Sequence, residues 1–140
     1  MMKSVSAWKQ ELSSGAHAAR LAALYCCAPD ETPAQAARYE AVLNGLDATF
    51  GPHAEAGLYS APGRTEIGGN HTDHNNGVVL AGSVNLDMVA VVSPNEDNII
   101  RVKSLGFDKI DDVDVNVLVP QPQEAEHSAS LIRGVAKGIV

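Results

Sequence analysis

The residues best suited to chemistry lie in one stretch, residues 61–87, which reads APGRTEIGGNHTDHNNGVVLAGSVNLD. It gathers Arg, His, Asp, Glu and Asn side chains between two apolar segments, an arrangement typical of binding loops held by a rigid scaffold. Glycines at positions 63, 68, 69 and 77 allow backbone conformations that side chains forbid, and a close approach to a ligand. The stretch is therefore the candidate functional segment.

Three interpretations of this segment stay open on the residues alone. In the first, the polar side chains only satisfy backbone groups of a turn-rich loop. In the second, His71, Asp73 and His74 bind a metal, although a full site needs further donors and no cysteine or second histidine pair supplies them. In the third, the ligand is polyhydroxylated, because Asp accepts hydrogen bonds from vicinal hydroxyls and Arg64 offers a fixed cationic fork to a phosphoryl group.

The spacing of the fixed residues closely resembles the galactokinase signature of the GHMP sugar-kinase superfamily. The resemblance extends over most of residues 55–140, and the residues that match without gaps are Gly63, Arg64, Gly69, His71, Thr72, Asp73, Gly77, Val79 and Leu80. It implies ATP-dependent phosphorylation of the anomeric hydroxyl of galactose by a cytoplasmic carbohydrate kinase of galactose metabolism. ATP and Mg²⁺ would then be ligands of the full-length enzyme.

The same resemblance implies a role for each matching residue. Arg64 is the catalytic cation, which stabilises the charge that develops during phosphoryl transfer. Asp73 accepts hydrogen bonds from galactose hydroxyls, His71 and Asn70 line the same sugar pocket, and Thr72 holds the loop. No metal ligand of the protein is implied.

Three residues depart from the family pattern. Glu66 stands where Asn is usual, Asn70 where a sugar-binding Glu is usual, and His74 where Tyr is usual. Since Asn70 is shorter than Glu and uncharged, one hydroxyl contact is weakened or passes through water. The alternatives to a strict galactokinase are a kinase for a related sugar such as N-acetylgalactosamine, and a non-catalytic sugar-sensing or regulatory relative.

The phosphate-binding half of the family's site has no counterpart in these 140 residues, because no GLSSSA-like run occurs in them. The chain also stops within a helical pattern, at Ala-Lys-Gly-Ile-Val. We therefore expect the amino-terminal portion of a larger kinase, inactive alone, which exposes an apolar face and self-associates through it.

The helices that precede the segment are predicted from apolar spacing. Val5, Trp8 and Leu12 begin a helical pattern that runs to Tyr25, with an interruption at Ser14-Gly15. A second helix is predicted from an N-cap at Thr32, with Pro33 and Gln35 in a capping box, to Gly51-Pro52; its apolar face is Tyr39, Leu43, Leu46 and Phe50. Residues 1–52 are predicted to be a helical extension, and residues 53–140 the start of the kinase domain.

Strands are predicted after residue 57. A short strand at 58–61 ends at Pro62-Gly63, and residues 64–77 form a polar loop. Residues 84–92 form a strand with at least one buried face, in which Val84, Leu86, Met88, Ala90 and Val92 alternate with Asn85, Asp87, Val89 and Val91, and a hairpin pairs this strand with one beginning at Ile99. A further strand spans 113–119, in an acidic stretch (residues 108–126) that we expect to be solvated surface.

The last element is a helix from Ser128 to Val140, which places Arg133 and Lys137 opposite its apolar face. The predicted class is α+β. The resemblance implies a GHMP-type, ribosomal-protein-S5-domain-2-like fold, truncated.

Composition limits the partners. The chain has 10 Lys and Arg against 17 Asp and Glu, a net charge of −7, which argues against nucleic acid or an anionic membrane surface. No apolar run approaches the roughly 20 residues of a membrane span, and no signal-peptide pattern is present. The two cysteines are adjacent and make no disulfide framework, so the expected compartment is the cytoplasm.

Overall fold

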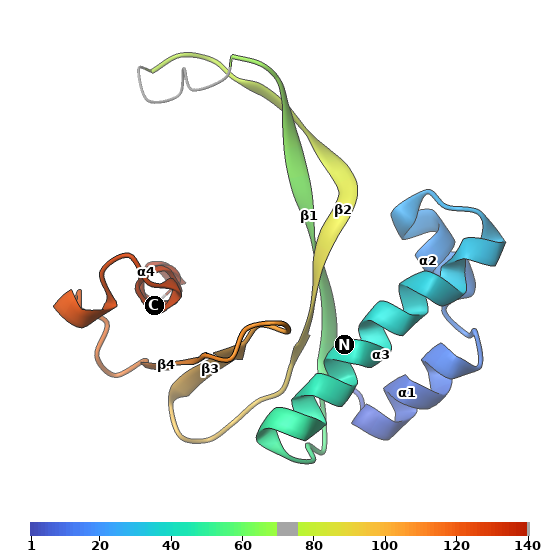
Figure 1. Ribbon diagram of the computed structural model, residues 1–140, viewed down its shortest axis with the longest axis horizontal. Helices are drawn as coiled ribbons and strands as arrows, with labels where there is room; N and C mark the ends of the chain where they lie inside the picture. The colour runs from blue at the N-terminus through green and yellow to red at the C-terminus, as the bar shows by residue number, and fades with distance from the viewer. Residues whose placement is uncertain (70–75, 140) are drawn as a thin grey trace. The chain divides into compact units, whose positions relative to one another are not determined.

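The computed structural model describes residues 1–69 and 76–139 and confirms the α+β class (Figure 1). Its contacts divide the chain into two compact units, Met1–Ser93 and Pro94–Val140. The predicted boundary after residue 52 is not tested by this division and stays a prediction. Each unit is described by itself below.

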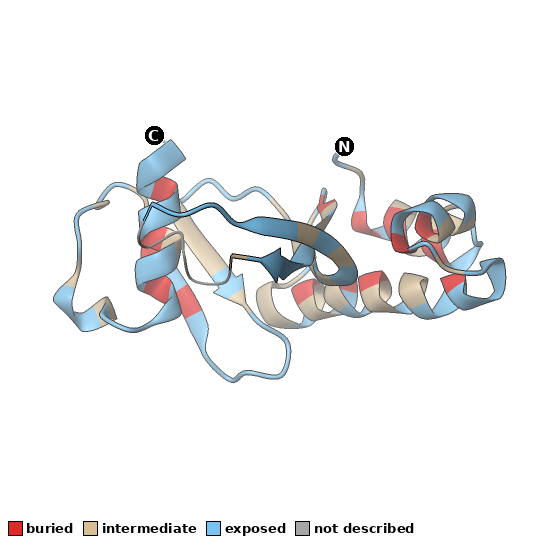
Figure 2. Cartoon of the chain, turned by 90° about the horizontal axis from the view of Figure 1, so that it is seen from above, coloured by how far each residue is buried: buried red, intermediate tan, exposed pale blue. Residues whose placement is uncertain are grey.

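The first unit begins with helices α1 (Val5–Ser13), α2 (Ala18–Tyr25) and α3 (Thr32–Phe50). The predicted interruption near Gly15 is confirmed, and Gly15 has the positive φ of +75° that favours glycine. Indole Nε1 of Trp8 donates to the carbonyl of Ala56, 2.8 Å away, and so ties α1 to the segment before the first strand. The helices turn buried positions toward one another (red in Figure 2). The core of the first unit consists of Val5, Trp8, Leu12, Leu21, Tyr25, Tyr39, Leu43, Leu46 and, just before β1, Ala56.

The start of α3 differs from the predicted capping box. A short 3₁₀ turn, η1 (Pro29–Glu31), leads directly into the helix, so Thr32 is already helical rather than its N-cap. The Thr32 hydroxyl donates to the carbonyl of Pro29 at 2.8 Å, and the Glu31 carboxylate accepts the backbone N–H of Ala28 at 2.8 Å. The predicted end of the helix is confirmed at Gly51, which has φ +82°.

Strands β1 (Gly57–Gly68) and β2 (Leu80–Val92) form an antiparallel hairpin. The prediction that the first strand ends at Pro62-Gly63 and that a loop begins at Arg64 is wrong, because β1 continues through both. Pro62 faces Asp87 and Arg64 faces Ser83, so Gly63 alone lies opposite residues 84–86 of β2. Such irregularities are the places where a strand accommodates proline and changes direction.

As the alternation predicts, one face of β2 packs against the core. Leu86 and Met88 are 77% and 76% exposed, whereas Val89 and Val91 pack against the helical core. The helices contact β2 on the face that also carries Asp87, whose polar partners lie on α2 and α3. The alternation itself is correct, but both faces are apolar and the sequence period cannot choose between them.

The second unit contains β3 (Ile99–Lys103), β4 (Ile110–Asp114), the 3₁₀ turn η3 (Pro122–Glu124) and α4 (Ser128–Ile139). The predicted hairpin between 84–92 and Ile99 is wrong, since β2 pairs with β1 and β3 pairs with β4. The predicted strand at 113–119 stops at Asp114, whose carboxylate accepts the backbone N–H of Asn116 at 2.8 Å. Such a side-chain bond stabilises a turn in place of further strand pairing.

Within residues 1–69 and 76–139, no helix has both the length and the apolar character needed to cross a membrane.

Candidate functional site

We call the part of β1 and β2 beyond the pair Pro62–Asp87 the outer half of the hairpin. Arg64 lies in this outer half, on the part of β1 that carries the signature. Its side chain is 74% exposed, and its Nη2 lies 3.3 Å from Oε1 of Glu66, two residues along the same strand face. Exposed ion pairs of this kind contribute little to stability. The other predicted site residues, Asn70, His71, Thr72 and Asp73, lie outside the described residues, as does His74.

Two signature glycines allow the backbones of the hairpin to approach each other. Gly69 has φ +80°, and a Cβ at this position would lie 2.3 Å from the carbonyl oxygen of Val78. A Cβ on Gly63 would lie 3.1 Å from the carbonyl oxygen of Leu86. Gly69 therefore admits no side chain, and Gly63 admits one only if its neighbours shift.

The most highly connected polar group of the first unit is Asp87 on β2, which the sequence did not single out. Its side chain is 3% exposed. Oδ2 accepts hydrogen bonds from the hydroxyl of Tyr25, at 2.6 Å, and from the hydroxyl of Ser60. Oδ1 accepts a bond of 2.6 Å from Nη2 of Arg38. One carboxylate thus joins α2, α3 and both strands of the hairpin.

A second layer of contacts supports this carboxylate. The hydroxyl of Tyr39 lies 2.8 Å from that of Tyr25 and donates to it, since Tyr25 uses its own proton toward Asp87. Nη2 of Arg38 also donates to the backbone carbonyl of Asp87 at 3.0 Å, and the guanidinium lies 5.5 Å from the centre of the Tyr25 ring. We call these five residues, Tyr25, Arg38, Tyr39, Ser60 and Asp87, the Asp87 cluster.

Electrostatics fix the protonation of this cluster. Burial acts to raise the pKa of Asp87, but hydrogen bonds from Ser60, Tyr25 and Arg38 outweigh it and hold that pKa below its ordinary value. Burial and the hydrogen bond to Asp87 both raise the pKa of Tyr25. At neutral pH the cluster therefore contains an Asp87 anion, an Arg38 cation and a neutral Tyr25.

A signal for Asp87 was present in the sequence but could not be interpreted without the partners. A carboxylate within an apolar strand is costly to bury unless it is paired. Its partners are 27 to 62 residues away along the chain, so no local pattern connects them.

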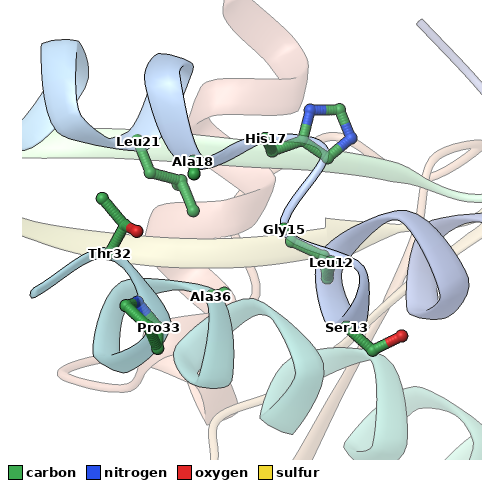
Figure 3. A pocket seen from close by; sticks show the side chains of 9 residues that line it. All are labelled: Leu12, Ser13, Gly15, His17, Ala18, Leu21, Thr32, Pro33 and Ala36. Carbon is green, nitrogen blue, oxygen red and sulfur yellow. The ribbon is translucent and has the colours of Figure 1, made fainter. Parts of the chain in front are cut away.

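Helices α1, α2 and α3 also surround a small pocket of about 110 Å³, whose lining is shown in Figure 3. Its lining is mostly apolar or small, and the ring nitrogen Nε2 of His17 is engaged with Oε2 of Glu11 at 2.7 Å. Ligand sites usually enclose about 300 Å³ or more. We assign this pocket no ligand.

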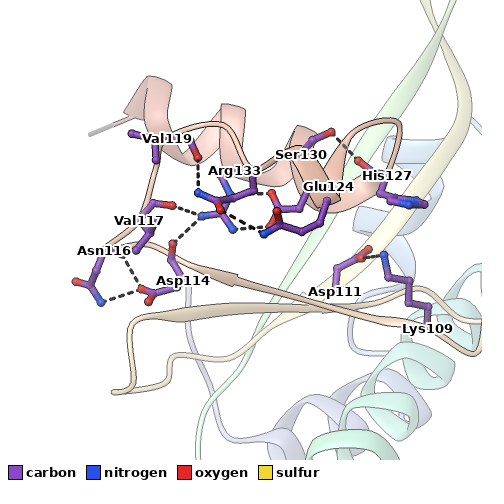
Figure 4. A network of polar contacts seen from close by, with 12 residues as sticks. Lys109, Asp111, Asp114, Asn116, Val117, Val119, Glu124, His127, Ser130 and Arg133 are labelled. Carbon is purple, nitrogen blue, oxygen red and sulfur yellow. Dashed lines mark hydrogen bonds and ion pairs between the residues drawn. The ribbon is translucent and has the colours of Figure 1, made fainter.

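The second unit contains a polar cluster around Arg133, shown in Figure 4. The prediction that Arg133 shares the solvent face of the last helix is wrong, because it is only 7% exposed. Its Nε and Nη2 donate to the two carboxylate oxygens of Glu124 at 2.7 and 2.6 Å. Its Nη1 donates to the carbonyls of Asp114, at 3.1 Å, and Val117.

The acidic stretch at 108–126 is therefore solvated only in part. Glu124 is paired with Arg133, and Oδ1 of the buried Asp111 lies 2.7 Å from Nζ of Lys109. The Ser128 hydroxyl at the start of α4 also donates to Asp111. These contacts hold the connection between β4 and α4 in place. The carboxylates that make them are paired and do not form a ligand site.

Comparison with known proteins bears on the first unit. A family model described as the galactokinase galactose-binding signature matches residues 47–94. This range begins in the last turn of α3 and includes the whole hairpin, with Arg64 and Asp87.

Curated relatives match over a similar part of the chain. A galactokinase of Lacticaseibacillus casei (strain BL23) is 39% identical over 74 residues, which are 53% of this chain and 19% of the relative. Galactokinases of Actinobacillus pleuropneumoniae serotype 5b (strain L20) and Chloroflexus aurantiacus are 36% and 34% identical over 80 and 88 residues; these cover 56% and 63% of this chain and 20% and 22% of the relatives.

The chain thus spans about a fifth of the length of the curated relatives it matches. No solved structure matches it significantly. The resemblance of this chain to the amino-terminal portion of galactokinases is confirmed.

Proposed function

Because the chain resembles the amino-terminal portion of galactokinases, we propose that it supplies the sugar-binding part of a galactokinase-like sugar kinase. Such an enzyme transfers a phosphoryl group from ATP to the anomeric hydroxyl of galactose. The observation that carries the proposal is the signature itself, in which Arg64, His71, Thr72 and Asp73 have the family's spacing within the matched range 47–94. We propose with it a GHMP-type, ribosomal-protein-S5-domain-2-like fold and a cytoplasmic location.

Each predicted site residue has a role in this proposal. Arg64 is the cation that stabilises the developing phosphoryl charge, and its exposed side chain, which among residues 1–69 and 76–139 pairs only with Glu66, is able to turn toward a ligand. Asp73 accepts hydrogen bonds from sugar hydroxyls, with His71 and Asn70 in the same pocket and Thr72 holding the loop. These four residues lie outside the described residues, so their roles rest on the sequence.

ATP and Mg²⁺ are the proposed ligands of the full-length enzyme. A glycine- and serine-rich loop at a helix N-terminus normally binds the nucleotide phosphates in this superfamily, and the 140 residues contain no such run. We expect that the chain alone binds the sugar weakly and does not phosphorylate it. Phosphorylation of galactose by the 140-residue chain with ATP and Mg²⁺ would contradict this expectation.

A related sugar or a non-catalytic sugar-sensing role is the second candidate. Asn70 is the observation that favours it, because a shorter amide replaces the carboxylate with which the family binds a hydroxyl. An amide donates as well as accepts, so it suits a ligand with an extra carbonyl acceptor, such as N-acetylgalactosamine. A preference for this sugar over galactose would support the second candidate.

Calorimetric titration of the chain with galactose, N-acetylgalactosamine and glucose tests the proposal. We expect galactose to bind in preference to glucose, and Asp73→Ala to weaken binding at least about tenfold, because a sugar hydroxyl loses a charged acceptor. Asp112→Ala is the matched control, since Asp112 is an exposed carboxylate of the second unit. Unchanged galactose affinity in Asp73→Ala would reject the sugar site.

We also propose that two copies associate through the exposed face of the hairpin. Tyr59, Leu86, Met88 and Val92 are each more than half exposed on this face. Apolar patches of this kind mark interaction surfaces. Sedimentation velocity should show a dimer that Met88→Lys dissociates, and a monomer at all concentrations that binds no hydrophobic dye would contradict the proposal.

A further inference from the structure

The Asp87 cluster lies at the point where the hairpin changes its register. Asp87 and Pro62 form the last pair of the regular inner half, and the next pair outward is Arg64 with Ser83. Between these pairs, one residue of β1 lies opposite three residues of β2. The direction of the outer half, and of Arg64 at its beginning, is set at this irregularity.

Contacts from the helices hold β2 at and beside the irregularity. Arg38 on α3 donates hydrogen bonds to both the side chain and the backbone carbonyl of Asp87. Tyr25 on α2 reaches Asp87 through its hydroxyl, and its backbone carbonyl accepts a bond of 3.4 Å from Nδ2 of Asn85. Ser60 on β1 also donates a hydrogen bond to Asp87, so the same carboxylate is linked to β1. The helices therefore hold β2 at the last regular pair, just before the irregularity.

The outer half of the hairpin has little other support. Every residue of β1 from Ala61 to Gly68 is exposed, whereas the inner residues Gly57, Leu58 and Ser60 are buried or half-buried. On the β2 side the outer residues 80–86 are exposed except Gly82 and Val84, which are half-buried. Since burial contributes little to orienting the outer half, its orientation depends on the last fixed point before it.

We propose that Asp87 is a positioning residue for the sugar site, which fixes the direction of the outer hairpin and with it the place of Arg64. This inference rests on the proposed function, in which Arg64 is the catalytic cation. Asp87 does not itself act as a base, because both of its oxygens already accept charged or hydroxyl donors and its side chain is buried. Directional bonds to a buried carboxylate determine an orientation that apolar contacts leave free.

The test compares Asp87→Asn and Ser60→Ala with two controls. Ser60→Thr retains the hydroxyl and suits a strand. Leu46→Ala destabilises the same core from a buried position on α3 and removes no hydrogen bond of the cluster. Amide hydrogen exchange of residues 64–68 and 80–83 and calorimetric binding of galactose are measured for each variant, at a temperature where all are folded.

In Asp87→Asn we expect outer-hairpin exchange to rise and galactose affinity to fall, each by about tenfold, the factor supplied by one hydrogen bond to a charged group. Ser60→Ala should shift both in the same direction and Ser60→Thr should restore them, whereas Leu46→Ala should leave both unchanged. Outer-hairpin exchange that is the same as in the unsubstituted chain, in both Asp87→Asn and Ser60→Ala, would overturn the proposal.

Two results separate this inference from the proposed function. If the unsubstituted chain binds no sugar, the proposed function fails, while the exchange measurement still decides whether Asp87 orients the outer hairpin. If Asp87→Asn does not fold, the comparison of Ser60→Ala with Ser60→Thr decides whether the cluster orients the outer hairpin. Ser60→Ala is the milder change, because the Ser60 hydroxyl supplies only one of the three side-chain donors to Asp87.

Discussion

Asp87 and Arg133 are both buried charged residues, but they bind partners at very different distances along the chain. Asp87 receives bonds from residues 27, 49 and 62 positions away, on β1, α3 and α2. Arg133 binds residues 9, 16 and 19 positions away, at the end of β4 and in the connection between β4 and α4. Asp87 joins the hairpin to α2 and α3, which otherwise contact it by apolar packing and by the hydrogen bond from Asn85 to Tyr25. Arg133 holds a local loop against a helix.

This difference gives the two charges different structural consequences. Loss of the Asp87 contacts weakens the attachment of the hairpin to two helices, so it affects the tertiary structure of the first unit. Loss of the Arg133 contacts releases one connection, while α4 keeps its own backbone hydrogen bonds. Substitutions in the two clusters should therefore differ in how far their effects spread.

The largest effect is expected from Asp87→Asn. The amide places a donor among Ser60, Tyr25 and Arg38 and leaves the Arg38 cation without its counter-charge. Because the Arg38 side chain is 37% exposed and can be hydrated, we expect a loss of about 2 kcal/mol, the size of a hydrogen bond to a charged group. Denaturant unfolding followed by the fluorescence of Trp8, the only tryptophan and a core residue of the first unit, measures the change. An unfolding free energy equal to that of the unsubstituted chain would show that the cluster does not stabilise the first unit.

A smaller and more local effect is expected from Arg133→Met. The methionine fills much of the space but leaves the Glu124 carboxylate and the carbonyls of Asp114 and Val117 without their donor. Amide exchange in η3 and α4 should become several-fold faster, while the Trp8 transition stays where it was. A shift of the Trp8 transition as large as that of Asp87→Asn would remove the distinction between the clusters.

The same contrast explains what the sequence could predict. The 3.6-residue period located α1, α3 and α4 because each has an apolar face, and glycines located the interruption at Gly15 and the end at Gly51. Local rules failed where a distant partner decides the outcome. Pro62-Gly63 indicated a strand end because the opposing residues of β2 were unknown, and Arg133 was assigned to solvent because Glu124 was not known to face it.

The candidate site divides in the same way. The resemblance to the family signature singled out Arg64 and residues 70–73 as candidate site residues, since a motif is local. Spacing could not identify Asp87, because its importance arises from α2 and α3, which precede it by dozens of residues. The alternation of β2 could not decide which of its faces is buried, for the related reason that only the packed helices distinguish two apolar faces.

Acid should weaken the Asp87 cluster by less than the substitution does. The folded state holds the pKa of Asp87 below the ordinary value of 3.8, so the unfolded chain takes up the proton first as pH falls. The stabilisation is therefore complete above about pH 5, declines as pH falls through 3.8, and is lost below the folded pKa. The difference in unfolding free energy between the unsubstituted chain and Asp87→Asn should shrink over this window. Other carboxylates with lowered pKa values, such as Glu11 and Asp97, are present in both the unsubstituted chain and Asp87→Asn, so their contributions cancel in this difference.

The smallest expected effect comes from Tyr39→Phe. It removes the outermost hydrogen bond of the cluster, in which Tyr39 donates to Tyr25, and leaves the three donors to Asp87 in place. One hydrogen bond between neutral groups contributes about 1 kcal/mol, and the phenylalanine ring keeps the packing of the buried Tyr39. Trp8 fluorescence in denaturant should show this loss, and hydrogen exchange in the outer hairpin should not change. If exchange there rises as much as in Asp87→Asn, the orientation of the hairpin depends on the whole tyrosine pair rather than on the carboxylate, and the special position of Asp87 is refuted.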